Sequence, residues 1–270
     1  MKTRIISALI FALVLLVILV INNPIVDTLF ITILSLIGVY EYNKAFKDAG
    51  YNPISWIGYI GCLSIFAIGD LIQDDLKISA IRIVLPIFLI AMFAYILFTN
   101  LKRSVIDIAI SILSVLCIPF LFSYIKQILV MDNGRILIWF VILGAFASDT
   151  FAYFIGSKFG KKKLCPNISP KKTVEGAIGG IIGVLISYTL LMLIANTFFS
   201  MNFEILHIII SAIIASIAGQ IGDLSFSAIK RFCKIKDFGT IIPGHGGILD
   251  RFDSILFVAP IIYVLLYFFI

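Results

Sequence analysis

The sequence predicts an all-α, polytopic membrane protein with about nine transmembrane helices. Of its 270 residues, 61% are hydrophobic and only 13% are charged, whereas about a quarter of the residues of soluble proteins are charged. Several apolar stretches reach the ~20 residues that a helix needs to cross a bilayer. Because a segment in lipid must pair its backbone polar groups internally, we expect runs this long and continuous to be helices.

Nine apolar segments can be drawn along the chain. They cover about residues 5–21, 24–43, 54–71, 79–100, 104–130, 135–158, 174–198, 204–230 and 252–269. Turn-prone groups separate several of them, as at Asn22-Asn23-Pro24 and Asp132-Asn133-Gly134. No small-residue cleavage site follows the first segment, so we interpret it as a retained anchor and not as a signal peptide.

The basic residues predict the orientation. With the N-terminus on the cytoplasmic side, few of the 21 Lys and Arg residues fall outside: Lys77, Arg82, Lys126 and Arg135. The positive-inside rule describes this asymmetry and also accounts for the net charge of +6, so we infer no nucleic-acid partner. The long polar loops 159–173 and 231–251 then lie on the same cytoplasmic side, where both can reach one soluble substrate.

The two halves of the chain differ in character. Residues 1–133 are mostly aliphatic and are expected to form a scaffold of transmembrane helices. Residues 134–270 carry most of the unusual polar residues and both long loops, so we expect them to form the catalytic half. The four cysteines show no CxxC or CxxH spacing, which argues against a zinc site or a disulfide framework.

The stretch 219–253 combines aspartates and basic residues with six glycines. Asp223 is costly inside a membrane segment unless it faces protein or water. Ser227 and Lys230 follow it at i+4 and i+7 and share its helix face. An aspartate so placed can hold a hard cation while the lysine meets a phosphate ligand of that cation. Asp250, at the predicted start of the last helix, is the second candidate metal ligand.

The last part of this stretch reads PGHGGILDRFD. Gly246 and Gly247, beside His245, let the backbone approach a ligand closely and present N–H groups, although a plain turn before a helix would contain the same residues. Both aspartates of this part could instead cap the last helix. For Asp253, capping or the orientation of Arg251 fits at least as well as ligation.

A second polar group surrounds the predicted helix start at Thr173. Free N–H groups and the helix dipole favour anions there, so Lys171 and Lys172 are candidate phosphate-binding residues. They are equally well explained as ordinary lysines of an inside loop. Glu175 could stabilise the same helix start, form an ion pair with a lysine or bind a metal. The glycines that follow, from Gly176 to Gly183, are better explained by close helix packing.

The sixth segment carries an aspartate near its end. Asp149, Tyr153 and Gly156 lie at i, i+4 and i+7 and so share one helix face. The cost of a carboxylate within a membrane makes Asp149 a candidate substrate-binding residue. The alternative is a hydrogen bond from a neighbouring helix near the membrane edge.

The polar residues of the second half form one long spaced pattern. It reads Ser227-x-x-Lys230-Arg231-x4-Lys236-Asp237-x5-Pro243-Gly244-His245-Gly246-Gly247-x-x-Asp250-Arg251-x-Asp253. This pattern resembles the signature of the phosphatidate cytidylyltransferases (CDP-diacylglycerol synthases). The shorter runs Ser169-Pro170-Lys171-Lys172-Thr173-x-Glu175-Gly176 and Asp149-x3-Tyr153-x2-Gly156 are similar to that family too. The resemblance covers about 145–253, whereas residues 1–133 match only as hydrophobic spans.

The resemblance implies a reaction and its partners. CTP and phosphatidate would give CDP-diacylglycerol and pyrophosphate in phospholipid biosynthesis, with Mg²⁺ required. It implies a multi-pass enzyme of the cell (inner) membrane, homodimeric, with its active site open to the cytoplasm and towards the bilayer. It also associates Asp223 and Asp250 with the metal centre, and leaves open whether a second cation joins Mg²⁺.

The chemistry of this reaction fits the residues. A phosphate monoester has a second pKa near ~6, so it is already largely ionised at neutral pH and needs no strong general base. The enzyme must supply positioning and neutralisation of the polyphosphate charge. We expect His245 to donate to a phosphate. The expected charge-neutralising residues are Lys171, Lys172, Lys230, Arg231, Lys236 and Arg251.

Two other classes of function remain open from the sequence. A related transferase acting on another lipid phosphate, or a CTP-using lipid kinase, would need similar residues. A transporter or channel would use intramembrane acids as an ion path and would place polar residues in matched halves. Here they gather in the second half and on one side, which argues against transport.

Overall fold

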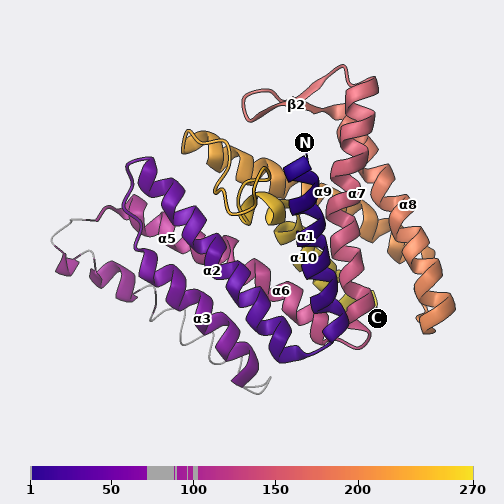
Figure 1. Cartoon of the computed structure of the whole chain (residues 1–270), viewed down its shortest axis with the longest axis horizontal. Helices are drawn as coiled ribbons and strands as arrows, with labels where there is room; N and C mark the ends of the chain where they lie inside the picture. Colours follow the sequence, from indigo (N-terminus) through magenta and orange to yellow (C-terminus); the bar gives the residue numbers. More distant parts are fainter. Residues whose placement is uncertain (1, 72–87, 89, 96, 100–102, 270) are drawn as a thin grey trace.

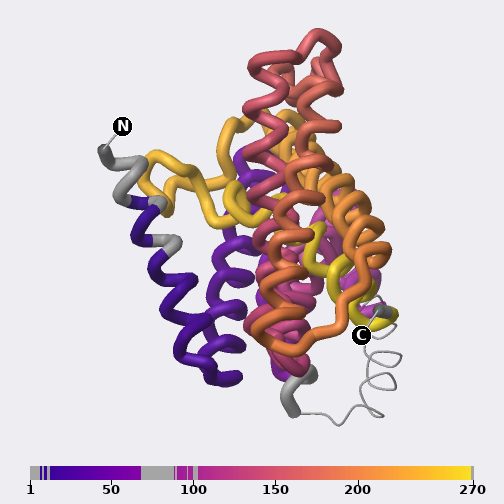
Figure 2. The backbone as a smooth tube through the Cα atoms, turned by 90° about the vertical axis from the view of Figure 1, so that its right-hand side faces the viewer, coloured from indigo at the N-terminus to yellow at the C-terminus, as the bar shows by residue number. Residues whose placement is uncertain are grey.

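The computed structural model describes residues 2–71, 88, 90–95, 97–99 and 103–269, which form a bundle of long helices (Figures 1 and 2). The first half contains α1 (Lys2–Ile21), α2 (Pro24–Asp48), α3 (Ser55–Leu71), α5 (Val105–Cys117) and α6 (Pro119–Val130). The second half contains α7 (Gly134–Phe159), α8 (Val174–Phe199), α9 (Ile205–Phe232) and α10 (Leu249–Phe269).

The prediction of a multi-pass membrane protein is confirmed. Within the described ranges, six stretches are long and apolar enough to cross a membrane: Pro24–Asp48, Val105–Val130, Gly134–Phe159, Val174–Phe199, Ile205–Phe232 and Leu249–Phe268. Helices α1 and α3 coincide with two more of the nine predicted segments. The predicted segment 79–100 lies mostly outside the described residues, so nine crossings stay a prediction.

The predicted loop 159–173 contains a hairpin, which departs from a purely helical fold. Strands β1 (Lys163–Cys165) and β2 (Ser169–Thr173) pair antiparallel, and the hairpin stands beyond the ends of α7 and α8 (Figure 1). The Glu175 carboxylate accepts hydrogen bonds from the backbone N–H groups of Lys161 and Lys162. Glu175 thus ties the base of the hairpin to the first turn of α8, and the Thr173 side chain caps this helix as predicted.

Helix ends follow the local chemistry of the sequence. The Asn23 side chain accepts from Ile25 N and Val26 N, and Pro24 opens α2, where its missing N–H costs nothing. Pro119 begins α6 and interrupts the predicted span 104–130, because proline cannot supply the N–H that would continue α5. Near the starts of α2 and α7, the Arg135 guanidinium binds the buried Asp27 carboxylate, with Nη1 3.0 Å from Oδ1.

Helices α7 and α8 pack closely through glycines. A Cβ at Gly176 would lie 2.8 Å from Ala152 O, and one at Gly180 would lie 2.9 Å from Ser148 Oγ. A Cβ at Gly183 would overlap the Phe151 ring. These contacts agree with the predicted packing role of the glycines, since small residues let membrane helices approach each other. Because α7 and α8 flank the hairpin, their contact also fixes where the hairpin lies.

One end of the bundle collects the polar loops. The segment between α9 and α10 lies at the same end as the hairpin and the start of α1 (Figures 1 and 2). Ser7 Oγ, on α1, donates to Pro243 O at 2.8 Å. The α10 C-terminal end lies at the opposite end of the bundle (Figure 1). The two predicted polar loops therefore share one end, as the candidate site requires.

Candidate active site

Asp250 lies in the first turn of α10 and is buried. Its Oδ1 accepts a hydrogen bond from Lys230 Nζ at 2.8 Å, and Lys230 comes from the last turn of α9. Its Oδ2 accepts from Phe238 N at 2.8 Å and from Gly247 N at 2.9 Å. A charge buried this deeply is tolerated because it is paired and hydrogen-bonded. Asp250 thus connects the end of α9, the loop and the start of α10.

A second lysine and aspartate form a pair beside the first. Lys172, on β2, forms an ion pair with Asp223 of α9. Burial lowers the pKa of Lys172 below its ordinary value, and the nearby carboxylates of Asp149 and Asp253 oppose this shift. The Asp223 side chain keeps 21% of its surface exposed, so this pair lies at the more open side of the cluster.

Two further carboxylates lie next to these pairs. Asp149, on α7, is exposed, and its Oδ2 lies 3.4 Å from the Ser254 hydroxyl, which donates to it. Asp253, on α10, is buried, and its Oδ1 accepts from Ser254 N at 2.8 Å. The Lys172 ammonium interacts electrostatically with both. Helices α7, α9 and α10 and strand β2 therefore each contribute charge to one cluster, which we call the aspartate–lysine cluster: Asp149, Lys172, Asp223, Lys230, Asp250 and Asp253.

The loop that carries Gly244, Gly246 and Gly247, called the glycine loop here, packs against Asp250 of this cluster. Gly244 and Gly246 have φ angles of +78° and +86°, a backbone conformation that favours glycine. A Cβ at Gly246 would lie 2.8 Å from Asp250 Oδ2. Gly247 gives its N–H to the same oxygen. Contacts with Asp250 therefore help to fix the positions of Gly246 and Gly247, besides any ligand that these glycines approach.

Several predicted site residues are exposed or make contacts outside the cluster. His245 Nδ1 is 3.3 Å from Ser7 Oγ, so the histidine contacts α1. Arg231 is exposed and donates to Ile168 O and Ile235 O, which ties the hairpin turn to the loop. Ser227 is half-buried on α9. The remaining predicted cations are exposed: Lys171, Lys236 and Arg251.

The predicted face of Asp149, Tyr153 and Gly156 is divided in the structure. Tyr153 is 71% exposed, so its ring lies on the outside of the bundle. A Cβ at Gly156 would lie 2.9 Å from Thr173 Oγ1 and 3.3 Å from Gly176 Cα. Gly156 therefore serves the contact between α7 and α8, and of these three residues only Asp149 belongs to the cluster.

Sequence reasoning missed one buried acid of this region. Glu41, on α2, accepts hydrogen bonds from Ile248 N and Leu249 N, both at 3.0 Å. It is 1% exposed. The signal was present, because Glu41 lies within a predicted membrane segment, where an acid is a functional candidate by default.

The donor chemistry of the cluster suits a hard cation. Within the described part of the chain, no three or more His, Cys, Asp or Glu side chains group as a protein-only metal site would. Mg²⁺ is usually held by one or two carboxylates together with substrate phosphates and water. Asp223 and Asp250 offer such oxygens beside lysines that can meet phosphates, so they fit Mg²⁺ with a nucleotide.

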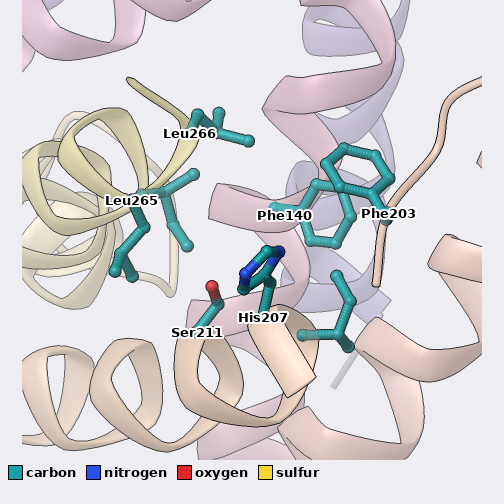
Figure 3. A pocket seen from close by; sticks show the side chains of 8 residues that line it. Phe140, Phe203, His207, Ser211, Leu265 and Leu266 are labelled. Carbon is teal, nitrogen blue, oxygen red and sulfur yellow. The ribbon is translucent and has the colours of Figure 1, made fainter. Parts of the chain in front are cut away.

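A small cavity, whose lining is drawn in Figure 3, lies between the start of α9 and the end of α10. It is lined by Phe140, Phe203, His207, Ser211, Leu265 and Leu266, among others. Its volume is about 20 Å³, room for little more than one water molecule. His207 and Ser211 lie at the start of α9, whereas Lys230 lies at its end. This cavity is therefore separate from the aspartate–lysine cluster and too small for a nucleotide.

Comparison with known proteins gives the family. The model of the cytidylyltransferase family matches residues 2–269. The phosphatidate cytidylyltransferase of Bacillus subtilis (strain 168) is 40% identical over 184 residues, 66% of this chain and 67% of the relative. Those of Staphylococcus saprophyticus and Staphylococcus aureus (strain COL) are each 35% identical, over 98% of this chain and 99% of the relative. The chain therefore belongs to the cytidylyltransferase family.

Proposed function

We propose that this protein transfers the cytidylyl group of CTP to phosphatidate, forming CDP-diacylglycerol and pyrophosphate. The observation that carries the proposal is the aspartate–lysine cluster, in which Lys172 and Lys230 each pair with an aspartate beside a glycine loop. It lies at one end of a membrane bundle, where a lipid headgroup and a soluble nucleotide can meet. The relatives named phosphatidate cytidylyltransferase support this assignment.

The proposed reaction requires the negative charge of the reacting phosphates to be neutralised. An ionised phosphate oxygen of phosphatidate attacks the α-phosphorus of CTP, the bond between the α-phosphorus and its bridging oxygen breaks, and pyrophosphate leaves with that oxygen. The lysines at 172 and 230 would neutralise phosphate oxygens as the new bond forms. Arg231, Lys236 and Arg251 are exposed, and we propose that they meet the outer phosphates. No side chain needs to remove a proton.

We further propose that Asp223 and Asp250 hold Mg²⁺ together with the CTP phosphates. Bound there, the ion would neutralise polyphosphate charge. The carboxylate donors and the partial exposure of Asp223 support this. Isothermal titration of Mg²⁺ into the protein with a non-hydrolysable CTP analogue tests it, because an Asp223→Asn variant should bind the metal more weakly while it remains folded.

The orientation is part of the proposal. Nine crossings with the N-terminus in the cytoplasm would place the aspartate–lysine cluster on the cytoplasmic side of the cell membrane. In a variant whose four native cysteines are replaced by serine, a single cysteine introduced as Lys163→Cys, in the exposed hairpin, should react with a membrane-impermeant maleimide in inverted vesicles but not in intact cells. Asp132→Cys, in the exposed turn before α7, is the matched control and should show the opposite behaviour.

Homodimerisation is likewise proposed, and its test is the mass of the detergent-solubilised protein.

The activity test uses purified protein, labelled CTP, Mg²⁺ and phosphatidate in mixed micelles. A CDP-lipid product with release of pyrophosphate is expected, and its absence would contradict the proposal. Competition by other lipid phosphate monoesters would identify a different acceptor. Phosphorylation of diacylglycerol by CTP would instead indicate a lipid kinase.

A further inference from the structure

Glu41 joins the first half of the chain to the glycine loop of the second half. It lies on α2 and is 1% exposed. Ile248 N donates to its Oε1 and Leu249 N to its Oε2, each at 3.0 Å. Both carboxylate oxygens therefore bind successive backbone N–H groups that lie more than 200 positions later in the sequence.

These N–H groups open helix α10, which begins at Leu249. The first N–H groups of a helix have no partner within it and are commonly capped by a polar side chain just before the helix. Here the preceding residue is Ile248, whose side chain cannot accept a hydrogen bond. Glu41 supplies the cap from another helix, and its negative charge is favourable at a helix N-terminus.

The loop is shaped to admit this carboxylate. A Cβ at Gly239 or at Gly247 would overlap the Glu41 carboxylate. The sequence alone suggested that the glycines at 246 and 247 let the backbone approach a ligand. The structure gives Gly247 a second reason, since a larger residue would displace Glu41. Gly239, which no sequence pattern singled out, has the same requirement.

Glu41 and the candidate metal ligand Asp250 both bind the backbone between Gly247 and Leu249. Gly247 N donates to Asp250 Oδ2, and the next two N–H groups, of Ile248 and Leu249, donate to Glu41. Three successive backbone donors are thus held by two carboxylates. If the backbone at Ile248 and Leu249 moved with Glu41, the turn that orients Asp250 would move too.

We infer that Glu41 is a positioning residue for cytidylyl transfer. It holds the segment 238–249 so that Asp250 and the loop N–H groups keep their arrangement for the nucleotide. For the reaction, this inference rests on the proposed function, whereas the contact itself does not. Because a misplacement of about 1 Å can cost about 100-fold in rate, the effect is expected on turnover.

The test compares Glu41→Gln with Asp27→Asn in the full-length protein. Glutamine keeps the size of Glu41 but has one acceptor oxygen, so one of the two N–H groups loses its partner. Asp27 is the matched control, because it is another buried acid of α2 but binds Arg135 at the opposite end of the bundle. Amide hydrogen exchange of the peptide containing Ile248 and Leu249 is measured beside kcat and KM, each corrected for the folded fraction.

Glu41→Gln is expected to speed exchange at this peptide and to lower kcat by about 10- to 100-fold, with KM for phosphatidate nearly unchanged. Asp27→Asn is expected to change neither that exchange nor kcat. Unchanged exchange in Glu41→Gln would contradict the contact. Faster exchange with an unchanged kcat would make the cap merely structural and would overturn the inference. If the wild type forms no CDP-lipid, the proposed function fails, while the exchange data still test the contact.

A second pair of variants tests the inference if Glu41→Gln does not fold. Gly239→Ala pushes a methyl group against the Glu41 carboxylate and is expected to lower kcat. Glu41→Asp shortens the acid by one methylene and makes room for that methyl group. The combined variant should therefore turn over faster than Gly239→Ala alone. Strictly additive losses would show that the two positions do not act through one contact.

Discussion

Lys230 and Asp250 form a buried ion pair between the last turn of α9 and the first turn of α10, with Nζ 2.8 Å from Oδ1. The ammonium also lies 5.6 Å from the centre of the Phe238 ring. The pair closes the loop between the two helices at its base. It therefore contributes to the fold and, in the proposed reaction, to charge neutralisation.

Removal of the lysine should destabilise the protein. Lys230→Met leaves the Asp250 carboxylate buried without its cation, which typically costs about 3–5 kcal/mol. The free energy of unfolding in detergent measures this cost. Lys236→Met, at an exposed lysine of the same loop, is the control and should change stability by less than about 0.5 kcal/mol. Equal stability of the two variants would contradict the buried pair.

Asp223 should matter more for turnover than for folding. Its side chain is partly exposed and pairs with Lys172, so Asp223→Asn is expected to fold. If it holds Mg²⁺ with the nucleotide, the variant should lose at least about 100-fold in kcat, measured across a Mg²⁺ titration. Asp132→Asn, an exposed acid at the opposite end, should keep full activity. Normal turnover in Asp223→Asn would remove the metal role.

Cys233 should react slowly with thiol reagents. It is 4% exposed, and burial raises its thiol pKa above the ordinary value. Single-cysteine variants retaining Cys233 or the half-buried Cys165 would be labelled with maleimide at pH 8, and Cys165 should react faster.

Because the folded protein holds the Cys233 proton more tightly than the unfolded chain does, the contribution of the protonated thiol to stability is complete below the ordinary thiol pKa. That contribution is lost as the pH rises through the folded value.

The contact between α7 and α8 should tolerate no added methyl group at Gly183. A Cβ there overlaps the Phe151 ring, and overpacking typically costs about 1–3 kcal/mol. Gly219→Ala is the control, because its nearest neighbour would be Val258 Cγ2 at 3.1 Å. Both variants gain about 1 kcal/mol of helix propensity. Thermal unfolding should therefore rank Gly183→Ala clearly below Gly219→Ala.

The sequence predicted the helical membrane fold well, because long apolar runs leave few alternatives in lipid. It also predicted that Asp223, Lys230 and Asp250 belong to one region, since an intramembrane charge needs a partner. It could not predict which lysine pairs with which aspartate. The Lys172–Asp223 and Lys230–Asp250 pairs depend on how α9, α10 and the hairpin pack, which no helical spacing encodes.

Two other features depended on tertiary contacts. The residues of 159–173 read as a polar loop, but the bonds from Lys161 N and Lys162 N to Glu175 hold them as the base of a hairpin. Glu41 was assigned to the scaffold half because local sequence gives no sign of a partner more than 200 residues away. The proposed division into residues 1–133 and 134–270 stays a prediction, and the bonds from Glu41 to Ile248 and Leu249 cross it.

The glycine-mediated contact of α7 with α8 also links the site to the lipid. Strand β2, which carries Lys172, leads directly into α8, so this lysine is held by two membrane helices packed almost backbone to backbone. A thinner or thicker bilayer changes the tilt of such helices to match their apolar length. We expect a change of tilt to shift Lys172, so turnover in the proposed reaction should depend on bilayer thickness.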